Sequence, residues 1–182
     1  ETDLFRSLKF IPGVQSTGDV SARYYVRGSQ SNENLVLLNG ATMYNPFHAF
    51  GLFSVIDSDI INNAEFYKGG FASEYGGRLS SVLNIITKDG NKTRFSGSVS
   101  TSFLSRKALF EGPIPGGSFI LTARKSYNDK IFNKFLNNIN APLDFYDMGG
   151  KINFSDPDFL KGGKIVIHGF MSKDDLDNQD LP

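Results

Sequence analysis

Two glycine pairs frame the stretch that most constrains this chain. Residues Glu65–Asp89 read EFYKGGFASEYGGRLSSVLNIITKD. Glycine tolerates positive φ and close backbone approach, so each pair marks a reversal of the chain. The pattern predicts strands at Glu65–Tyr67 and Leu79–Thr87, with a compact segment between them that Phe71 and Tyr75 anchor. We therefore expect a rigid junction whose turn or hinge glycines are Gly69, Gly70, Gly76 and Gly77.

The character of the sequence changes after this junction. Before Thr87, patterns typical of strands and helices alternate irregularly. Beyond it, strand patterns follow one another between Gly- and Pro-rich turns. We expect one domain over residues 1–90 and a second, rich in β-strands, over residues 91–182.

The first domain is predicted to combine helices with strands. Thr2 or Asp3 caps a short helix that ends at Pro12-Gly13. Two short strands follow at Tyr24–Arg27 and Leu35–Leu38. Asp57–Ala64 is predicted to be a helix, because its isoleucines and Ala64 recur on one side at helical spacing. With the strands around the glycine pairs, this gives a small α+β domain.

The second domain shows period-two alternation, which gives a strand one polar and one apolar face. In FSGSVSTSF every second residue is serine. About five consecutive antiparallel strands are predicted, at Phe95–Phe103, Lys107–Gly112, Phe119–Tyr127, Tyr146–Phe154 and Lys164–Met171. Their connections are a tight turn at Leu104–Arg106, a reverse turn at Pro113–Gly117, a long loop at Asn128–Leu143 with a short helix at Ile131–Asn137, and a terminal acidic loop, DDLDNQD.

Alternation alone does not separate a soluble sheet from a transmembrane barrel, in which the polar face lines the lumen and the apolar face meets lipid. Long loops at one end and short turns at the other favour the barrel. Lys plus Arg and Asp plus Glu both number 19, so the basic excess of a nucleic-acid binder is missing. No cysteine is present for a disulfide or a thiolate zinc site. The start, ETDLFRSLKF, does not resemble a signal peptide.

Several fragments of the first domain resemble the plug domain of TonB-dependent outer-membrane receptors, in the order of that family. They are LKFIPGV (Leu8–Val14), YYVRGS (Tyr24–Ser29), NLVLLNG (Asn34–Gly40) and EFYKGG followed by SEYGGRLSSVLNIIT. YGGRLSSV, together with EGPI at Glu111–Ile114, resembles the subgroup that carries a carboxypeptidase-regulatory-like domain before the plug. The resemblance implies an α+β plug domain followed by the first antiparallel strands of a transmembrane β-barrel of about 22 strands.

The resemblance also implies a function. The plug would gate energised uptake of a substrate through a barrel in the bacterial outer membrane, with neither catalysis nor a cofactor. Its implied partners are a TonB-type energy-transducing protein that grips a segment before Glu1, the lipid bilayer, and a surface lipoprotein lid or other outer-membrane subunits. One alternative is a non-transporting receptor or assembly subunit on the same scaffold. Another is a soluble β-rich enzyme or adhesin.

Two sets of site residues follow from the resemblance. Arg27 and Arg78 would contact the inner barrel wall, with Glu65 and Glu111 as the carboxylates to consider as partners. Substrate would meet outward-facing plug loops, through Gln15, Ser16, Gln30, Asn32, Tyr44, Asn45 and His48. In each case an ordinary surface or packing role is the alternative.

Other motifs indicate no further chemistry. Lys68-Gly69-Gly70 lacks the residues of a phosphate-binding loop. The only two histidines, His48 and His168, fall in different domains, and their spacing from carboxylates does not indicate a metal site. The run Asp174, Asp175, Asp177 and Asp180 lacks the glycine and terminal glutamate of an EF-hand, which favours a solvated loop over a Ca²⁺ site.

Overall fold

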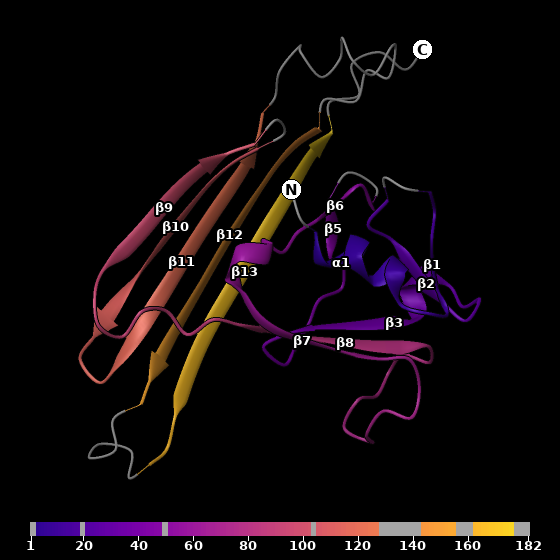
Figure 1. Cartoon of the computed structure of the whole chain (residues 1–182), viewed down its shortest axis with the longest axis horizontal. Helices are drawn as coiled ribbons and strands as arrows, with labels where there is room; N and C mark the ends of the chain where they lie inside the picture. The colour runs from indigo at the N-terminus through magenta and orange to yellow at the C-terminus, as the bar shows by residue number, and fades with distance from the viewer. Residues whose placement is uncertain are drawn as a thin grey trace. The chain divides into compact units, whose positions relative to one another are not determined.

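The structure is a computed structural model that describes residues 3–18, 21–48, 51–102, 105–127, 143–155 and 162–176 (Figure 1). The chain forms two compact units, Glu1–Lys88 and Asp89–Pro182. Each unit is described by itself.

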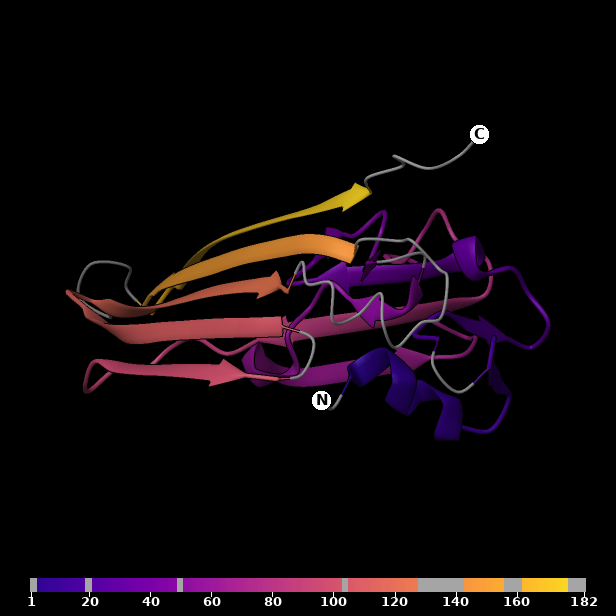
Figure 2. The ribbon, with the colours of Figure 1, turned by 90° about the horizontal axis from the view of Figure 1, so that it is seen from above.

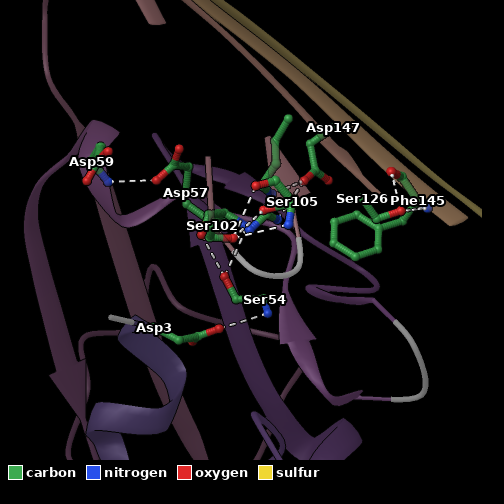
Figure 3. A network of polar contacts seen from close by, with 11 residues as sticks. Asp3, Ser54, Asp57, Asp59, Ser102, Ser105, Ser126, Phe145 and Asp147 are labelled. Carbon is green, nitrogen blue, oxygen red and sulfur yellow. Dashed lines mark hydrogen bonds and ion pairs between the residues drawn. The ribbon is translucent and has the colours of Figure 1, made fainter. Parts of the chain in front are cut away.

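A short helical segment opens the first unit. Helix α1 (Leu4–Ser7) continues into the 3-10 turn η1 (Leu8–Phe10). Asp3 caps it, since its Oδ1 accepts hydrogen bonds from the backbone N–H groups of Phe5 (2.9 Å) and Arg6 (3.4 Å). The other carboxylate oxygen accepts a bond from the N–H of Ser54 at 2.9 Å, as Figure 3 shows. The cap therefore also ties the start of the helix to a distant strand.

A four-stranded sheet in the order β4-β3-β8-β7 organises the first unit. Its strands are β3 (Asn34–Leu38), β4 (Ala41–Thr42), β7 (Ile61–Tyr67) and β8 (Ser81–Thr87). Strands β3 and β8 run parallel at the centre, which explains their nearly continuous apolar sequences. Two small hairpins flank this sheet: β1 (Val14–Ser16) with β2 (Tyr24–Val26), and β5 (Phe47–His48) with β6 (Phe53–Ser54). The 3-10 turn η2 (Ser31–Glu33) precedes β3.

Buried aromatic and aliphatic side chains hold this unit together. The ring of Phe5 packs against those of Tyr24 and Phe47, with centroids 6.0 and 5.1 Å apart. Val82, Leu83 and Ile85 of β8 are fully buried. Burial raises the pKa of the Tyr24 hydroxyl far above its ordinary range.

The predicted helix at Asp57–Ala64 is wrong. The segment forms one 3-10 turn, η4 (Ser58–Ile60), and Ile61 already begins strand β7. Strand β7 pairs with β8, and its register shifts between Ile61 and Asn63. Such a bulge breaks the period-two pattern of a strand, so the start of β7 does not alternate as a regular strand does.

The second unit is one antiparallel sheet of five strands in chain order, which Figures 1 and 2 show side by side. The strands are β9 (Ser96–Thr101), β10 (Ser105–Ile114), β11 (Gly117–Ser126), β12 (Leu143–Phe154) and β13 (Ile165–Leu176). The predicted succession of antiparallel strands is confirmed, although several boundaries differ from the prediction.

The differences arise at the turns. Strand β10 already begins at Ser105, so the predicted turn at Leu104–Arg106 is wrong for its last two residues. The reverse turn at Pro113–Gly117 is shorter than predicted, because Pro113 pairs with Ser118 and Ile114 with Gly117. Pro113 fits in a strand because β9 pairs with β10 only as far as Glu111, so no neighbour needs its missing N–H.

Two further loops were predicted in this unit. Asp174, Asp175 and Leu176 belong to β13 and pair with β12, so the acidic loop prediction is wrong for them. The rest of that loop lies outside the described residues, as do residues 128–142 of the predicted loop at Asn128–Leu143, with the short helix predicted there. Leu143 begins strand β12, so the loop prediction is wrong for that residue. Among the residues that are described, no helix is long and apolar enough to cross a membrane.

Candidate functional site

The sheet of the second unit has two chemically different faces. Directly paired residues of neighbouring strands lie on the same face, and the register pairs Arg124 with Asp147, Ile120 with Lys151 and Ser118 with Asn153. These side chains are all buried. The opposite face carries exposed apolar side chains from every strand: Val99, Phe110, Leu121, Met148, Ile152, Ile165, Ile167 and Met171. The sheet therefore separates a polar, charged face from an apolar one.

An ion pair between β11 and β12 lies on the polar face. Nε of Arg124 donates to Oδ2 of Asp147 at 2.7 Å, and Nη2 approaches the same oxygen. Both side chains are less than one tenth exposed. The guanidinium also lies over the ring of Phe145, 5.4 Å from its centroid. A low-dielectric, hydrogen-bonded pair of this kind orients both side chains strongly.

Asp89, the first residue of the second unit, contacts three strands. Its Oδ1 lies 2.7 Å from Nζ of Lys151 on β12, and its Oδ2 lies 2.8 Å from Nζ of Lys164, just before β13. Its backbone carbonyl accepts a hydrogen bond from Oγ of Ser118 on β11 at 2.6 Å. Burial alone would raise the pKa of Asp89, but the hydrogen bonds and charges of Lys151 and Lys164 outweigh burial and lower it. Asp89 thus binds the sheet at the edge where β11 begins, β12 ends and β13 is about to begin.

The glycine-pair segment of the first unit folds back onto the sheet. Phe71 and Tyr75, with Tyr67, pack against a buried cluster of Leu35, Leu37 and Val82. The rings of Tyr67 and Tyr75 have centroids 5.8 Å apart. The φ angles of Gly69, Gly70 and Gly77 are 143°, 65° and 82°, whereas Gly76 is not among the positive-φ glycines. Three of the four predicted turn glycines thus have a backbone that L-residues rarely adopt.

Glu65 lies close to this segment and bonds within the first unit. Its Oε2 accepts hydrogen bonds from the hydroxyl of Tyr67 and from Nδ2 of Asn84, both at 3.3 Å. The charge of Glu65 is the largest influence that raises the pKa of Tyr67. Burial, followed by the charges of Glu74 and Glu65, raises the pKa of Tyr75.

The other residues predicted to contact a barrel wall lie at the surfaces of their units. Arg27 is exposed and has a positive φ of 52°. Its Nη1 lies 3.3 Å from the position that a Cβ atom would take at Gly69. Arg78 is half-buried and donates to the carbonyl of Gly77 at 3.2 Å. Glu111 is half-buried on β10 and shares the polar face with Ser96 of β9. The predicted contacts across the two units stay predictions.

The predicted substrate-facing residues divide by exposure. Gln15 and Ser16 lie on β1, while Gln30 and Asn32 lie at the η2 turn, where Gln30 and Glu33 form a capping box. Tyr44 is 87% exposed and Asn45 is also exposed, in the stretch between β4 and β5. His48 is only 1% exposed, so burial leaves it almost no surface for a ligand. Among the described residues, no group of acidic, histidine or cysteine side chains could hold a metal ion.

Sequence reasoning missed the anchor at Asp89 and the pair of Arg124 with Asp147. A signal existed for the pair, because both residues fall on the polar side of an alternating strand. Asn39 was missed as well. Its Oδ1 accepts the backbone N–H of Thr87 at 2.9 Å and its Nδ2 donates to Oγ1 of Thr87 at 2.9 Å, which ties the end of β3 to the end of β8.

Comparison with known proteins agrees with this arrangement. Residues 1–82 match the family model described as TonB-dependent Receptor Plug Domain. A solved structure, the ferric citrate transporter FecA in its unliganded form, is similar in fold, with a TM-score of 0.62 and 16% sequence identity. The match covers 97% of this chain and 29% of the FecA chain, so this chain spans less than a third of that transporter.

The five-stranded sheet does not close into a barrel within this chain. Plug and strands together have the order and fold of the corresponding part of a plugged barrel. Residues 1–82 therefore match the plug domain of TonB-dependent receptors, and the chain as a whole has the fold of a plug followed by antiparallel strands of a plugged barrel.

Proposed function

We propose that this chain is the gate and the first part of the wall of a bacterial outer-membrane transporter. The plug would block the barrel until an energised periplasmic partner pulls on a segment that precedes Glu1. The exposed loops around Gln15, Gln30 and Tyr44 would meet the substrate. This chain would perform binding and gating and no covalent chemistry.

One observation carries the proposal. The sheet that follows the plug buries Arg124, Asp147, Lys151 and Asn153 on one face and exposes its apolar side chains on the other. Charged residues are stabilised on a lumen-facing or protein-facing wall, whereas exposed apolar side chains suit a lipid-facing one. A soluble sheet would have the reverse preference, with its apolar face covered by a core.

The proposal also gives the surface arginines of the plug a role. Arg27 and Arg78 would form bidentate contacts with carboxylates of the complete barrel wall, because the planar guanidinium fits a carboxylate with two parallel hydrogen bonds. Glu111, on the polar face of β10, is one such carboxylate within this chain. These contacts would hold the plug in the closed position.

Conductance of the full-length protein in a planar lipid bilayer tests gating. The native protein should conduct little, while a form that lacks residues 1–88 should open a large water-filled pore. Cells that express the shortened form should become sensitive to vancomycin, which is too large for ordinary porins. Equal conductance of the two forms, with both inserted in the bilayer, would contradict a gating role for the plug.

A further inference from the structure

A groove lies on the apolar face of the β9–β13 sheet. Its volume is about 400 Å³, and residues of β9, β10, β11 and β12 line it. This volume falls within the range of roughly 300–1,000 Å³ typical of small-molecule sites. The groove belongs entirely to the second unit, and its lining also includes Arg124 and Asp147, the residues of the ion pair described above.

The groove exists because two short side chains lie between longer ones. Val99, Ala108, Ala123 and Met148 form one row across four strands, since each is paired with the next. Val99 is 81% exposed and Met148 is 48% exposed, so both project from the sheet on either side of the alanines. The alanines form an apolar floor wide enough for a hydrocarbon chain.

Cations border this row on one side. Arg106 and Lys125 are directly paired in the next row, and both line the groove. The guanidinium of Arg106 is exposed and makes no hydrogen bond or ion pair with any residue that the structure describes. Nζ of Lys125 lies 3.9 Å from Asp144, with the lysine side chain 50% exposed, and such an exposed pair contributes little. Lys173 continues the row, where its ammonium is paired with Asp175.

An apolar floor with cations at one end fits an anionic amphiphile. Arg106 supplies a fork of donors that suits phosphate oxygens, and Lys125 adds a second positive charge. The cations lie at the end of the strands where residues 128–142 connect β11 and β12, opposite the two-residue turn at Pro115-Gly116. Because long loops of transmembrane barrels face the cell exterior, this end belongs to the outer leaflet.

We propose that the groove binds one anionic, phosphate-bearing lipid of the outer leaflet. The acyl chain lies over Ala108 and Ala123, and the phosphate contacts Arg106 and Lys125. The inference rests on the proposed function, because the groove meets lipid only if the sheet is part of a membrane barrel. A dissolved phosphate would leave the apolar floor unused, so a lipid is the occupant that matches both halves of the site.

Native mass spectrometry of the full-length receptor in dodecyl maltoside tests the site with two synthetic lipids, dioleoyl phosphatidic acid and dioleoyl phosphatidylcholine. The native protein should retain phosphatidic acid in preference. Arg106→Ala and Lys125→Ala should each weaken its binding about fivefold, which corresponds to about 1 kcal/mol for one cation near an anionic lipid. Ala123→Phe fills the groove and should reduce retention of both lipids. Lys92→Ala removes an exposed cation outside the groove and should change nothing.

Equal retention of the two lipids by folded native protein, or undiminished phosphatidic acid binding in the Arg106→Ala and Lys125→Ala variants, would overturn the lipid site. Displacement of phosphatidic acid by millimolar inorganic phosphate would overturn the lipid assignment in favour of a simple anion site. In each of these results the protein still requires detergent, so the proposed function stands. A receptor that is monodisperse without detergent would contradict the proposed function itself.

Discussion

Replacement of Asp89 by asparagine should release the segment that leads into the second unit. The side chain keeps its shape but loses its charge, while the Lys151 side chain, only 7% exposed, stays beside it. The variant therefore removes a carboxylate that neutralises a buried ammonium. The partly exposed Lys164 loses a partner too, and the hydrogen bond from Asn153 at 3.3 Å weakens.

The expected cost is about 1–3 kcal/mol for local opening of this segment. Removal of one partner of a fully buried pair costs about 3–5 kcal/mol, and removal from an exposed pair about 0–1 kcal/mol. Asp89 lies between these limits, since its side chain is 31% exposed and its two lysine partners are 7% and 47% exposed. By the same reasoning, Lys164→Ala should cost at most about 1 kcal/mol, which makes it the matched control.

Limited trypsin digestion of the full-length protein measures this opening, because Lys88, Lys92 and Arg94 are exposed in the segment around Asp89. Cleavage that requires local opening tracks the open population. Asp89→Asn should therefore accelerate cleavage there about 5–150-fold, since 1.4 kcal/mol corresponds to a factor of ten. A rate equal to that of Lys164→Ala would refute the anchoring role. Adding Lys151→Met to Asp89→Asn should restore most of the protection, because it removes the uncompensated charge.

The same contact predicts a pH dependence. The pKa of Asp89 is lowered by Lys151 and Lys164 below its ordinary value of 3.8. A lowered carboxyl pKa stabilises the folded state above the unfolded pKa, and that contribution is lost as pH falls through the folded value. Hydrogen exchange of the amides in 89–95 should therefore differ between native protein and Asp89→Asn at neutral pH. The difference should begin to shrink near the unfolded pKa of about 4 and vanish only below the folded pKa of Asp89.

Three further predictions concern substitutions in the plug. Gly77→Ala should destabilise the glycine-pair segment by about 1–2 kcal/mol, because the φ of Gly77 is 82°. Gly76→Ala should be tolerated. Equal hydrogen-exchange protection of the two variants would contradict the backbone argument. Asn39→Gly keeps the positive φ but loses the bonds to Thr87, and should cost about 1–2 kcal/mol; unchanged hydrogen exchange at the end of β8 would count against that tie. Arg78→Ala should raise leak of small solutes through the complete receptor without abolishing folding; unchanged permeability would speak against a contact with the barrel wall.

The strands of the second unit were predictable because each carries its own alternation of polar and apolar residues. The serines at 96, 98, 100 and 102 alternate with apolar or small residues, and that pattern needs no tertiary context. The register was not predictable. It depends on which residues the turns place opposite each other. The two-residue turn at Pro115-Gly116 pairs Arg124 with Lys107, and a five-residue turn would shift that register.

The errors and omissions have the same physical origin. The strand Ile61–Tyr67 was taken partly for a helix because a bulge disturbs its alternation, and only pairing with β8 resolves the ambiguity. Asp89 was not singled out, because its role comes from lysines far along the chain. Exposed loop residues such as Tyr44 were located by resemblance, but burial of His48 depends on packing that no local pattern specifies.

In the proposed barrel, strand β11 has one face toward lipid and one away from it. Single cysteines at positions 118–124 test it, because this chain contains no cysteine of its own. Nitroxides attached to the full-length protein in bilayers report access to oxygen, which concentrates in lipid, and to a water-soluble nickel chelate. Phe119, Leu121 and Ala123 should favour oxygen, while Ser118, Ile120, Thr122 and Arg124 should not. Absence of this period-two alternation, or equal access of nickel to both faces, would contradict the assignment of the sheet to a membrane barrel.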